Sequence, residues 1–135
     1  MSQVYQRTLP LLREETEFYW TSGKDGKLRF MRCQDCGNWI HPVLPVCPKC
    51  HSRSLAPEAV SGKGEVFSYT INAKSWGPGM EVPFIVAVVS LPEQKGLQLI
   101  TKLVGVKPEE VRVGMPVEVT FVQDEDVWIP MFKAA

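Results

Sequence analysis

Four cysteines constrain this chain more than any other feature of its sequence. Cys33, Cys36, Cys47 and Cys50 lie within eighteen residues, as two Cys-x-x-Cys pairs separated by ten residues. Each pair can form a knuckle, a tight turn that brings two sulfurs to one ion, and four thiolates fill the tetrahedral shell of zinc. Because a catalytic zinc keeps one position open for water, this closed set predicts one structural Zn²⁺ per chain.

Local residues around the cysteines fit such knuckles. Gly37 directly follows the first pair, where the turn often needs a positive φ angle. His51 occupies the matching position after the second pair, and histidine is one of the few other residues enriched at positive φ. His41 and His51 are rival ligands in principle. Four cysteines already satisfy the ion, however, so we expect both histidines to be solvated.

Other uses of four cysteines fit this sequence less well. Disulfides are typical of small secreted domains, and the first residues contain no apolar segment after the first charge, so no secretory signal is predicted. A redox dithiol is expected in a βαβ context, which the pattern does not predict. A [2Fe–2S] cluster or a rubredoxin-like iron also takes four cysteines and stays open as an alternative.

Composition and charge exclude several classes of protein. The longest purely apolar run, residues 84–89, has six residues, whereas a membrane-spanning helix needs about 20. We therefore expect a cytoplasmic protein without membrane contact. Residues 1–63 carry nine Lys and Arg against six Asp and Glu, and residues 64–135 carry six against nine. Neither part is as basic as a typical nucleic-acid binder.

The N-terminal part, residues 1–26, is predicted to be a helical segment. Apolar residues recur at helical spacing over residues 9–22, with a proline in the first turn and a glycine near the end. Phe18, Tyr19 and Trp20 are consecutive and cannot all face one way. Either at least one of them contacts a partner or ligand, or all three pack within the protein, and the sequence leaves both interpretations open.

Two β modules are predicted after this segment. A zinc ribbon is expected at residues 27–60, with short strands at 28–32 and 38–41, and a flexible joint follows at 61–64. Residues 61–135 then contain five strand patterns, which is typical of a small Greek-key barrel of the OB type, with another small barrel or a sandwich fragment as alternatives. The expected strands are 65–72, 84–91, 97–103, 117–122 and 127–133.

The sequence contains no evident catalytic machinery. It has no Gly-x-Ser-x-Gly nucleophile elbow and no phosphate-binding glycine-rich loop before a helix. Every cysteine is assigned to the metal, and both histidines lie in the predicted ribbon. The acidic residues 124–126 are expected to form a solvated hairpin turn. The residues themselves therefore predict no catalytic site.

The order and spacing of several short segments resemble a family of small bacterial and archaeal proteins. These proteins pair a rubredoxin-like zinc ribbon with an OB-fold, and the family was long catalogued only as a domain of unknown function. The resemblance covers about residues 10–132, with two departures: His51 replaces the usual glycine, and Ala56-Pro57 replace a common aromatic. The matching segments are Glu17–Trp20, Arg32–Gly37, His41-Pro42, Cys47–Cys50, Ser61–Thr70, Pro83-Phe84 and Val113–Val117.

The resemblance implies a mainly β fold, with an N-terminal helix, a rubredoxin-like zinc ribbon and a C-terminal five-stranded OB-fold barrel. It also implies a non-catalytic zinc-binding subunit of an acyl-CoA-processing hetero-oligomer, whose thiolase-like (thiolase, acyltransferase or aldolase) or hydratase-like partner carries the catalytic residues. It leaves open whether a CoA ester lies at the interface. The expected contacts are the ribbon, Phe18, Tyr19, Trp20, and Trp76 in a long loop.

One alternative function remains from the sequence. OB-folds and zinc ribbons also occur in proteins that bind single-stranded nucleic acids, which need a basic groove and stacking aromatics. Phe67 and Tyr69 are two residues apart on one predicted strand, as a stacking pair would be. The acidic balance of residues 64–135 argues against this alternative.

Overall fold

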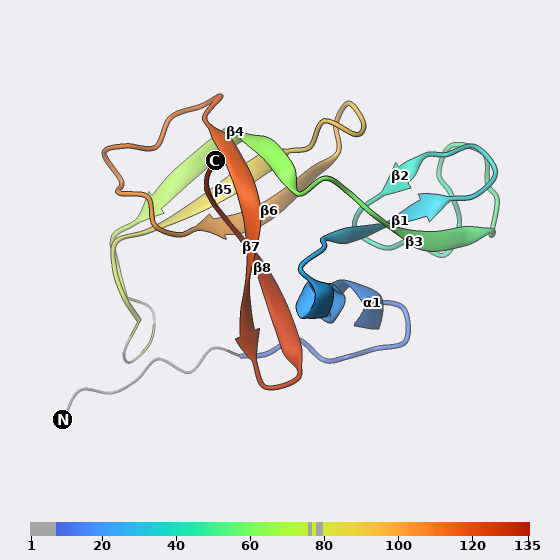
Figure 1. The fold of residues 1–135 in the computed structure, drawn as a ribbon, viewed down its shortest axis with the longest axis horizontal. Helices are drawn as coiled ribbons and strands as arrows, with labels where there is room; N and C mark the ends of the chain where they lie inside the picture. The colour runs from blue at the N-terminus through green and yellow to red at the C-terminus, as the bar shows by residue number, and fades with distance from the viewer. Residues whose placement is uncertain (1–7, 76, 78–79) are drawn as a thin grey trace.

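The structure is a computed structural model that describes residues 8–75, 77 and 80–135. A small three-stranded sheet and a closed five-stranded barrel lie side by side, with a short helical region beside both (Figure 1). This mainly β architecture confirms the predicted fold class. The elements are α1 (Glu17–Trp20), the 3₁₀ helix η1 (Ser22–Asp25), β1 (Arg29–Cys33), β2 (Trp39–Ile40), β3 (Leu55–Ala59), β4 (Lys63–Asn72), β5 (Phe84–Ser90), β6 (Gln98–Leu103), β7 (Pro116–Asp124) and β8 (Val127–Ala134).

The N-terminal helix is much shorter than the sequence pattern predicted. Helical structure over residues 9–22 was expected, but the α-helix is confined to α1, and η1 follows it. Leu11 belongs to the predicted apolar stripe, yet 72% of its surface is exposed. Thr16 precedes α1 without a capping side-chain hydrogen bond. Because short helices depend on the packing of an apolar face, the exposure of Leu11 near the start of the stripe is consistent with the helix being confined to its end.

The three-stranded sheet has the order β2-β1-β3, with both pairs antiparallel. The central strand β1 pairs Met31 with Ile40 on one side and with Pro57 on the other. β3 was not predicted, because a proline interrupts its strand pattern. Proline lacks the N–H of an inner strand but is tolerated at a sheet edge, which is where β3 lies.

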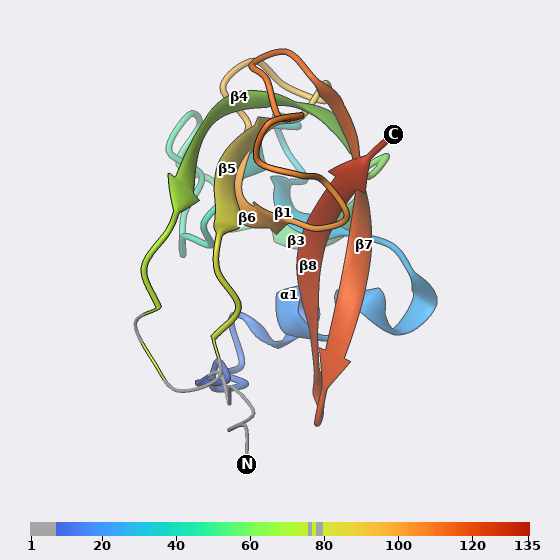
Figure 2. The same cartoon turned by 90° about the vertical axis from the view of Figure 1, so that its left-hand side faces the viewer.

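The barrel closes in the order β4-β5-β6-β8-β7, and the five predicted strands are confirmed to within a few residues at their ends. Figure 2 shows the β7–β8 hairpin extending past the barrel, alongside α1. Alternate residues of β5 and β6 face inward, as period-two patterning predicts. The largest fully buried barrel side chains are Val66, Ile85, Val89, Val117, Val127 and Phe132.

The loop between β5 and β6 joins the two modules. The side-chain amide of Gln94 accepts a hydrogen bond from the Trp39 N–H at 2.8 Å and donates one to the Trp39 carbonyl at 3.1 Å. The neighbouring Glu93 accepts a hydrogen bond from the N–H of Ser61 at 2.7 Å. These contacts hold both the ribbon and the start of the predicted joint at residues 61–64.

Ribbon and barrel also share one hydrophobic core. Leu28, Phe30 and Trp39 of the ribbon region belong to the same buried cluster as the inner residues of the barrel. On the other side, η1 packs closely on the β7–β8 hairpin. The approach is so close that a Cβ atom added to Gly23 would lie 2.5 Å from Cδ1 of Phe121. The helical region, the ribbon and the barrel therefore pack as one body.

Candidate functional site

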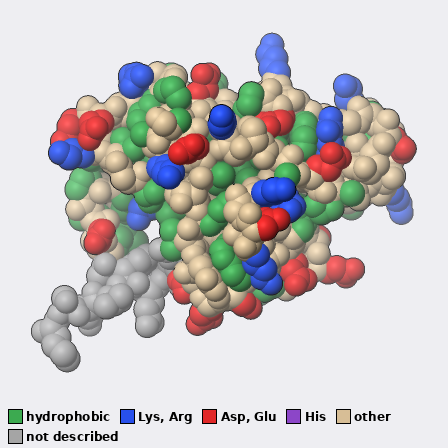
Figure 3. Space-filling model, in the orientation of Figure 1, with side chains coloured by type: hydrophobic (Ala, Val, Ile, Leu, Met, Phe, Trp, Pro, Cys, Tyr) green, Lys and Arg blue, Asp and Glu red, His purple; other side chains and the backbone are tan. Residues whose placement is uncertain are grey.

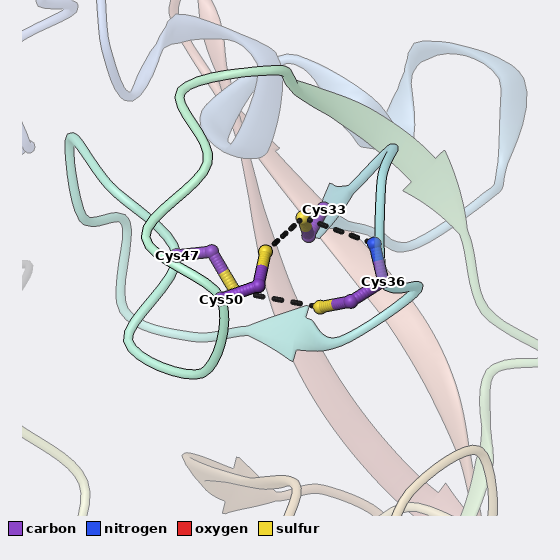
Figure 4. A group of neighbouring side chains, drawn as sticks. All are labelled: Cys33, Cys36, Cys47 and Cys50. Atoms are coloured by element: carbon purple, nitrogen blue, oxygen red, sulfur yellow. Dashed lines mark hydrogen bonds between the residues drawn. The ribbon is translucent and has the colours of Figure 1, made fainter.

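The four cysteines converge on a single point. Figure 4 shows their sulfurs directed toward one another from the two knuckles, and all four sulfurs lie within 4.8 Å of one another. The Sγ atoms of Cys33 and Cys50 are 3.5 Å apart, and those of Cys36 and Cys47 are 3.6 Å apart. Zinc–sulfur bonds of about 2.3 Å place tetrahedral sulfurs about 3.8 Å apart. The cluster therefore fits one structural Zn²⁺ per chain.

The two knuckles share one backbone pattern. In the first, the N–H of Gly37 donates to the Cys33 carbonyl at 3.0 Å, and in the second, the N–H of His51 donates to the Cys47 carbonyl at 2.9 Å. Gly37 has φ 77° and His51 has φ 64°. The positive φ angles predicted for both positions are confirmed, so His51 holds a conformation that is costlier for it than for glycine.

Substituting histidine at position 37 and glycine at position 51 tests the contribution of backbone strain, because neither substitution changes a metal ligand. Gly37→His is expected to lower the free energy of unfolding by about 1 kcal/mol, because an L residue at positive φ costs roughly 1–2 kcal/mol. His51→Gly is expected to raise the free energy of unfolding by a smaller amount, because the relief of backbone strain exceeds the entropy cost of glycine only slightly. Urea unfolding of the zinc-loaded proteins measures both. Equal losses in the two variants would contradict the shared pattern.

The electrostatics of the cluster favour a cation once all four thiols are ionised. The backbone N–H of Cys36 lies 3.5 Å from Sγ of Cys33 and lowers the pKa of that thiol. The N–H of Ser52 likewise lowers the pKa of Cys50. The hydrogen bond between Cys50 and Cys33, burial and the other two thiols outweigh this effect and raise the pKa of Cys50 to about 12. Four sulfurs so close together ionise fully only when a metal ion offsets their repulsion.

Arg32 adds positive charge beside the first knuckle, and the sequence analysis did not single it out. Its Nε donates to the Gly37 carbonyl at 2.9 Å, and its guanidinium lies 4.6 Å from the centre of the Trp39 ring. Glu58 on β3 completes an ion pair with it at 3.4 Å. Alternation along β1 places Arg32 on the same face as Phe30 and opposite Cys33, and pairing with β2 sets it directly across from Trp39.

The aromatic residues of α1 differ in their surroundings. Tyr19 packs against the core, with its ring centre 6.2 Å from that of Phe30 and 5.3 Å from that of His41, and burial raises the pKa of Tyr19. Phe18 and Trp20 are half-buried. Contact of these three aromatics with a partner stays a prediction. For Tyr19, the structure shows packing within the chain, which is the other of the two interpretations that the sequence left open. Trp76 lies outside the described residues.

His41 is half-buried and therefore only partly solvated, which departs from the expectation of a solvated histidine. Its ring stacks on Phe30 at 4.4 Å between centres, with 13° between the planes, and burial lowers the pKa of His41. His41 follows the second strand of the ribbon, and this position carries it onto the interface with α1. His51 is exposed, as expected. In the described part of the chain, the four cysteines are the sole group of His, Cys, Asp or Glu side chains placed to hold a metal.

An apolar groove opens where the helical region, the ribbon and the barrel meet. It has a volume of about 540 Å³ and is lined by Trp20, Pro42, Val88 and Ile100, among others. Ile100 points outward from β6 and is 73% exposed. The sequence analysis did not identify this groove, because its residues come together only through the packing of three separate segments.

Within residues 8–75, 77 and 80–135, none of the helices has the length and apolar character needed to cross a bilayer.

Comparison with known families assigns both modules. Residues 20–56 match the family described as the ChsH2 rubredoxin-like zinc ribbon domain. Residues 57–122 match the family described as the ChsH2 C-terminal OB-fold domain. The two matches are adjacent and together cover most of the chain.

Relatives carry the same pair of modules in named assemblies. The chain is 33% identical over 130 residues to a probable enoyl-CoA hydratase alpha subunit of Thermomonospora curvata, covering 96% of this chain and 40% of that protein. It is 29% identical over 113 residues to the benzoylsuccinyl-CoA thiolase subunit BbsA of Thauera aromatica, covering 82% of this chain and 76% of that protein. The chain thus spans about two fifths of the hydratase alpha subunit.

A solved structure agrees with these matches. A chain of the Ltp2-ChsH2(DUF35) aldolase superimposes with a TM-score of 0.83 at 31% sequence identity, covering 93% of this chain and 98% of that one. The cysteine cluster, the closed barrel and the matches to both modules lead to one conclusion. The chain belongs to the ChsH2-type DUF35 family, which joins a rubredoxin-like zinc ribbon to an OB-fold.

Proposed function

We propose that this chain is a non-catalytic zinc-binding subunit of an acyl-CoA-processing complex, and that a thiolase-like or hydratase-like partner carries the catalytic residues. The observation that supports this most is the set of relatives. They are described as a hydratase alpha subunit, a thiolase subunit and a component of an aldolase assembly. All three descriptions concern enzymes that consist of more than one kind of subunit.

The chemistry of the chain supports a subunit role. All four cysteines lie in the metal cluster, and a zinc with four thiolates has no open position for water or substrate. Charged side chains of both signs are scattered over the face shown in Figure 3, with hydrophobic patches between them. Such scattered apolar surface is ordinary, but a contiguous apolar groove such as the one beside Trp20 is typical of protein or ligand contacts. A CoA ester at the shared interface stays a prediction.

Co-expression with a candidate partner tests the proposal. A cognate thiolase-like or hydratase-like subunit is expected to co-purify with this chain and to process CoA esters only, or much faster, in its presence. The chain alone is expected to show no turnover. Purification of the chain as a monomer that turns over CoA esters unaided would contradict the proposal. Micromolar binding of a single-stranded oligonucleotide at about 150 mM salt would instead favour the nucleic-acid alternative.

A further inference from the structure

One edge of β4 is left open along most of its length. β4 pairs with β5 as far as Asn72, but it pairs with β7 only through its first three residues, Lys63–Glu65. The last backbone contacts on the β7 side are those of Val66, which donates to the Met115 carbonyl at 3.0 Å and accepts from the Gly114 N–H at 2.7 Å. In Figure 2, β4 continues beside β5 on the side away from β7.

The register shows which backbone groups face this open edge. Val66 pairs with Val89 of β5, and the β5 residues two and four positions before Val89 pair with Tyr69 and Ile71. A β-bulge after Val66 accounts for the odd spacing on β4. In an antiparallel ladder, hydrogen-bonded and non-hydrogen-bonded pairs alternate, so every second residue of a strand directs its N–H and C=O groups toward the same neighbouring strand. Tyr69 and Ile71, like Val66, therefore direct these groups away from β5.

Within the residues that the structure describes, the open edge lacks the usual protection. Phe67 is 57% exposed, Tyr69 39% and Ile71 41%. Residues 66–73 contain no charged residue and no proline. Natural proteins normally place lysine, proline or a covering segment on such an edge, because it is a ready template for another strand. Among the described residues, no strand pairs with this edge beyond residue 66.

We propose that the open edge of β4, residues 67–71, takes an extended segment of the catalytic partner subunit as an additional β-strand. This inference rests on the function proposed above. The N–H and C=O groups of Tyr69 and Ile71 supply the main-chain hydrogen bonds of strand addition. Because this stretch is uncharged and exposes apolar side chains, the incoming segment is uncharged and carries apolar residues at alternate positions.

Continuity of the surface favours the catalytic subunit as the occupant. Ser68 of β4 pairs with Val88, and Val88 pairs with Ile100 of β6. Val88 and Ile100 line the apolar groove beside Trp20. The open edge and the groove are thus about two strand spacings, roughly 10 Å, apart. A single partner can cover both.

Other occupants fit less well. A five-residue strand is about 17 Å long and 10 Å wide, a footprint of roughly 170 Å², whereas a stable interface buries about 800 Å² per partner. Pairing of two copies through this edge alone therefore falls short. A single-stranded nucleic acid needs cations for its phosphates, and residues 66–73 offer none.

Amide hydrogen exchange on the wild-type chain, alone and in complex with the co-expressed catalytic subunit, tests the proposal. The amides of Tyr69 and Ile71 are expected to exchange rapidly in the isolated chain and at least tenfold more slowly in the complex. The amides of Ser68 and Thr70, which face β5, are the internal controls, and they are expected to be protected in both states. Tyr69→Pro, which removes one edge donor, is expected to weaken the complex at least tenfold while zinc content stays unchanged.

Three results would overturn the inference, and they differ in whether the proposed subunit role is contradicted as well. A complex in which Tyr69 and Ile71 still exchange rapidly removes the strand addition but leaves the subunit role intact. The absence of any complex with the wild-type chain removes the subunit role and this inference together. Protection of both amides in the isolated chain, together with a dimer in solution, assigns the edge to a second copy.

Discussion

Replacing Cys47 with alanine is expected to abolish zinc binding and to unfold the ribbon. Cys47 is fully buried, and its sulfur lies 3.6 Å from that of Cys36. A structural zinc contributes an apparent binding free energy of about 10–16 kcal/mol, which in small metal domains is folding free energy. Around the knuckles little else stabilises the ribbon, because the buried cluster there consists of Cys33, Ile40 and Cys47 and β2 has only two residues. Metal analysis should find one zinc per wild-type chain and less than about a tenth of that in the variant.

A matched variant and a spectrum complete this test. Lys49→Ala changes an exposed residue of the same knuckle that offers no sulfur, and it is expected to keep the full zinc content. Amide exchange should show loss of protection in the knuckles and β2 of the Cys47 variant, while the inner strands of the barrel remain protected. Full zinc retention by Cys47→Ala would contradict the four-cysteine site. A red protein with an iron-type spectrum would favour the iron alternative.

Replacing Tyr19 with alanine is expected to lower the free energy of unfolding by about 3 kcal/mol, as removal of a large packed aromatic ring does. The ring fills the space beside Phe30 and His41, so its loss leaves a cavity between α1 and the ribbon. Tyr19→Phe keeps the ring and is expected to cost less than about 1 kcal/mol. Thermal and urea unfolding of the zinc-loaded variants measure both changes. Equal stability of Tyr19→Ala and the wild type would show that this packing contributes little.

This result separates stability from partner binding at α1. A variant with all three aromatics replaced would not separate loss of a partner contact from loss of stability, because Tyr19 packs against the core. The double variant Phe18→Ala/Trp20→Ala leaves Tyr19 in place and is therefore the informative one. It is expected to fold, to bind zinc and to lose co-purification with the catalytic subunit. Normal binding by this variant would remove Phe18 and Trp20 from the interface.

Features set by local chemistry were predictable from the sequence. The spacing of the cysteines determines the metal site, and the turn of each knuckle determines the φ angles of Gly37 and His51. The barrel strands were predictable because alternate residues face a buried interior. These signals are all contained within a few residues of sequence.

Features that depend on contacts between distant segments were not predictable. The stripe over residues 9–22 has helical spacing, but Leu11 near its start is largely exposed in the folded chain and the helix covers only the end of the stripe. β3 pairs with β1 despite Pro57, since an edge strand does not need every N–H. His41 and the groove beside Trp20 are defined by packing between α1, the ribbon and β6. The edge of β4 is open because its pairing with β7 stops after its first three residues. No local sequence pattern indicates where that pairing stops.

The loop between β5 and β6 limits how modules of this family can be recombined. Gln94 hydrogen-bonds both backbone groups of Trp39, and Glu93 holds the N–H of Ser61. A chimera that takes its ribbon from one relative and its barrel from another would place an unmatched loop against a foreign strand. We expect functional chimeras only when residues 91–97 are transplanted together with the ribbon.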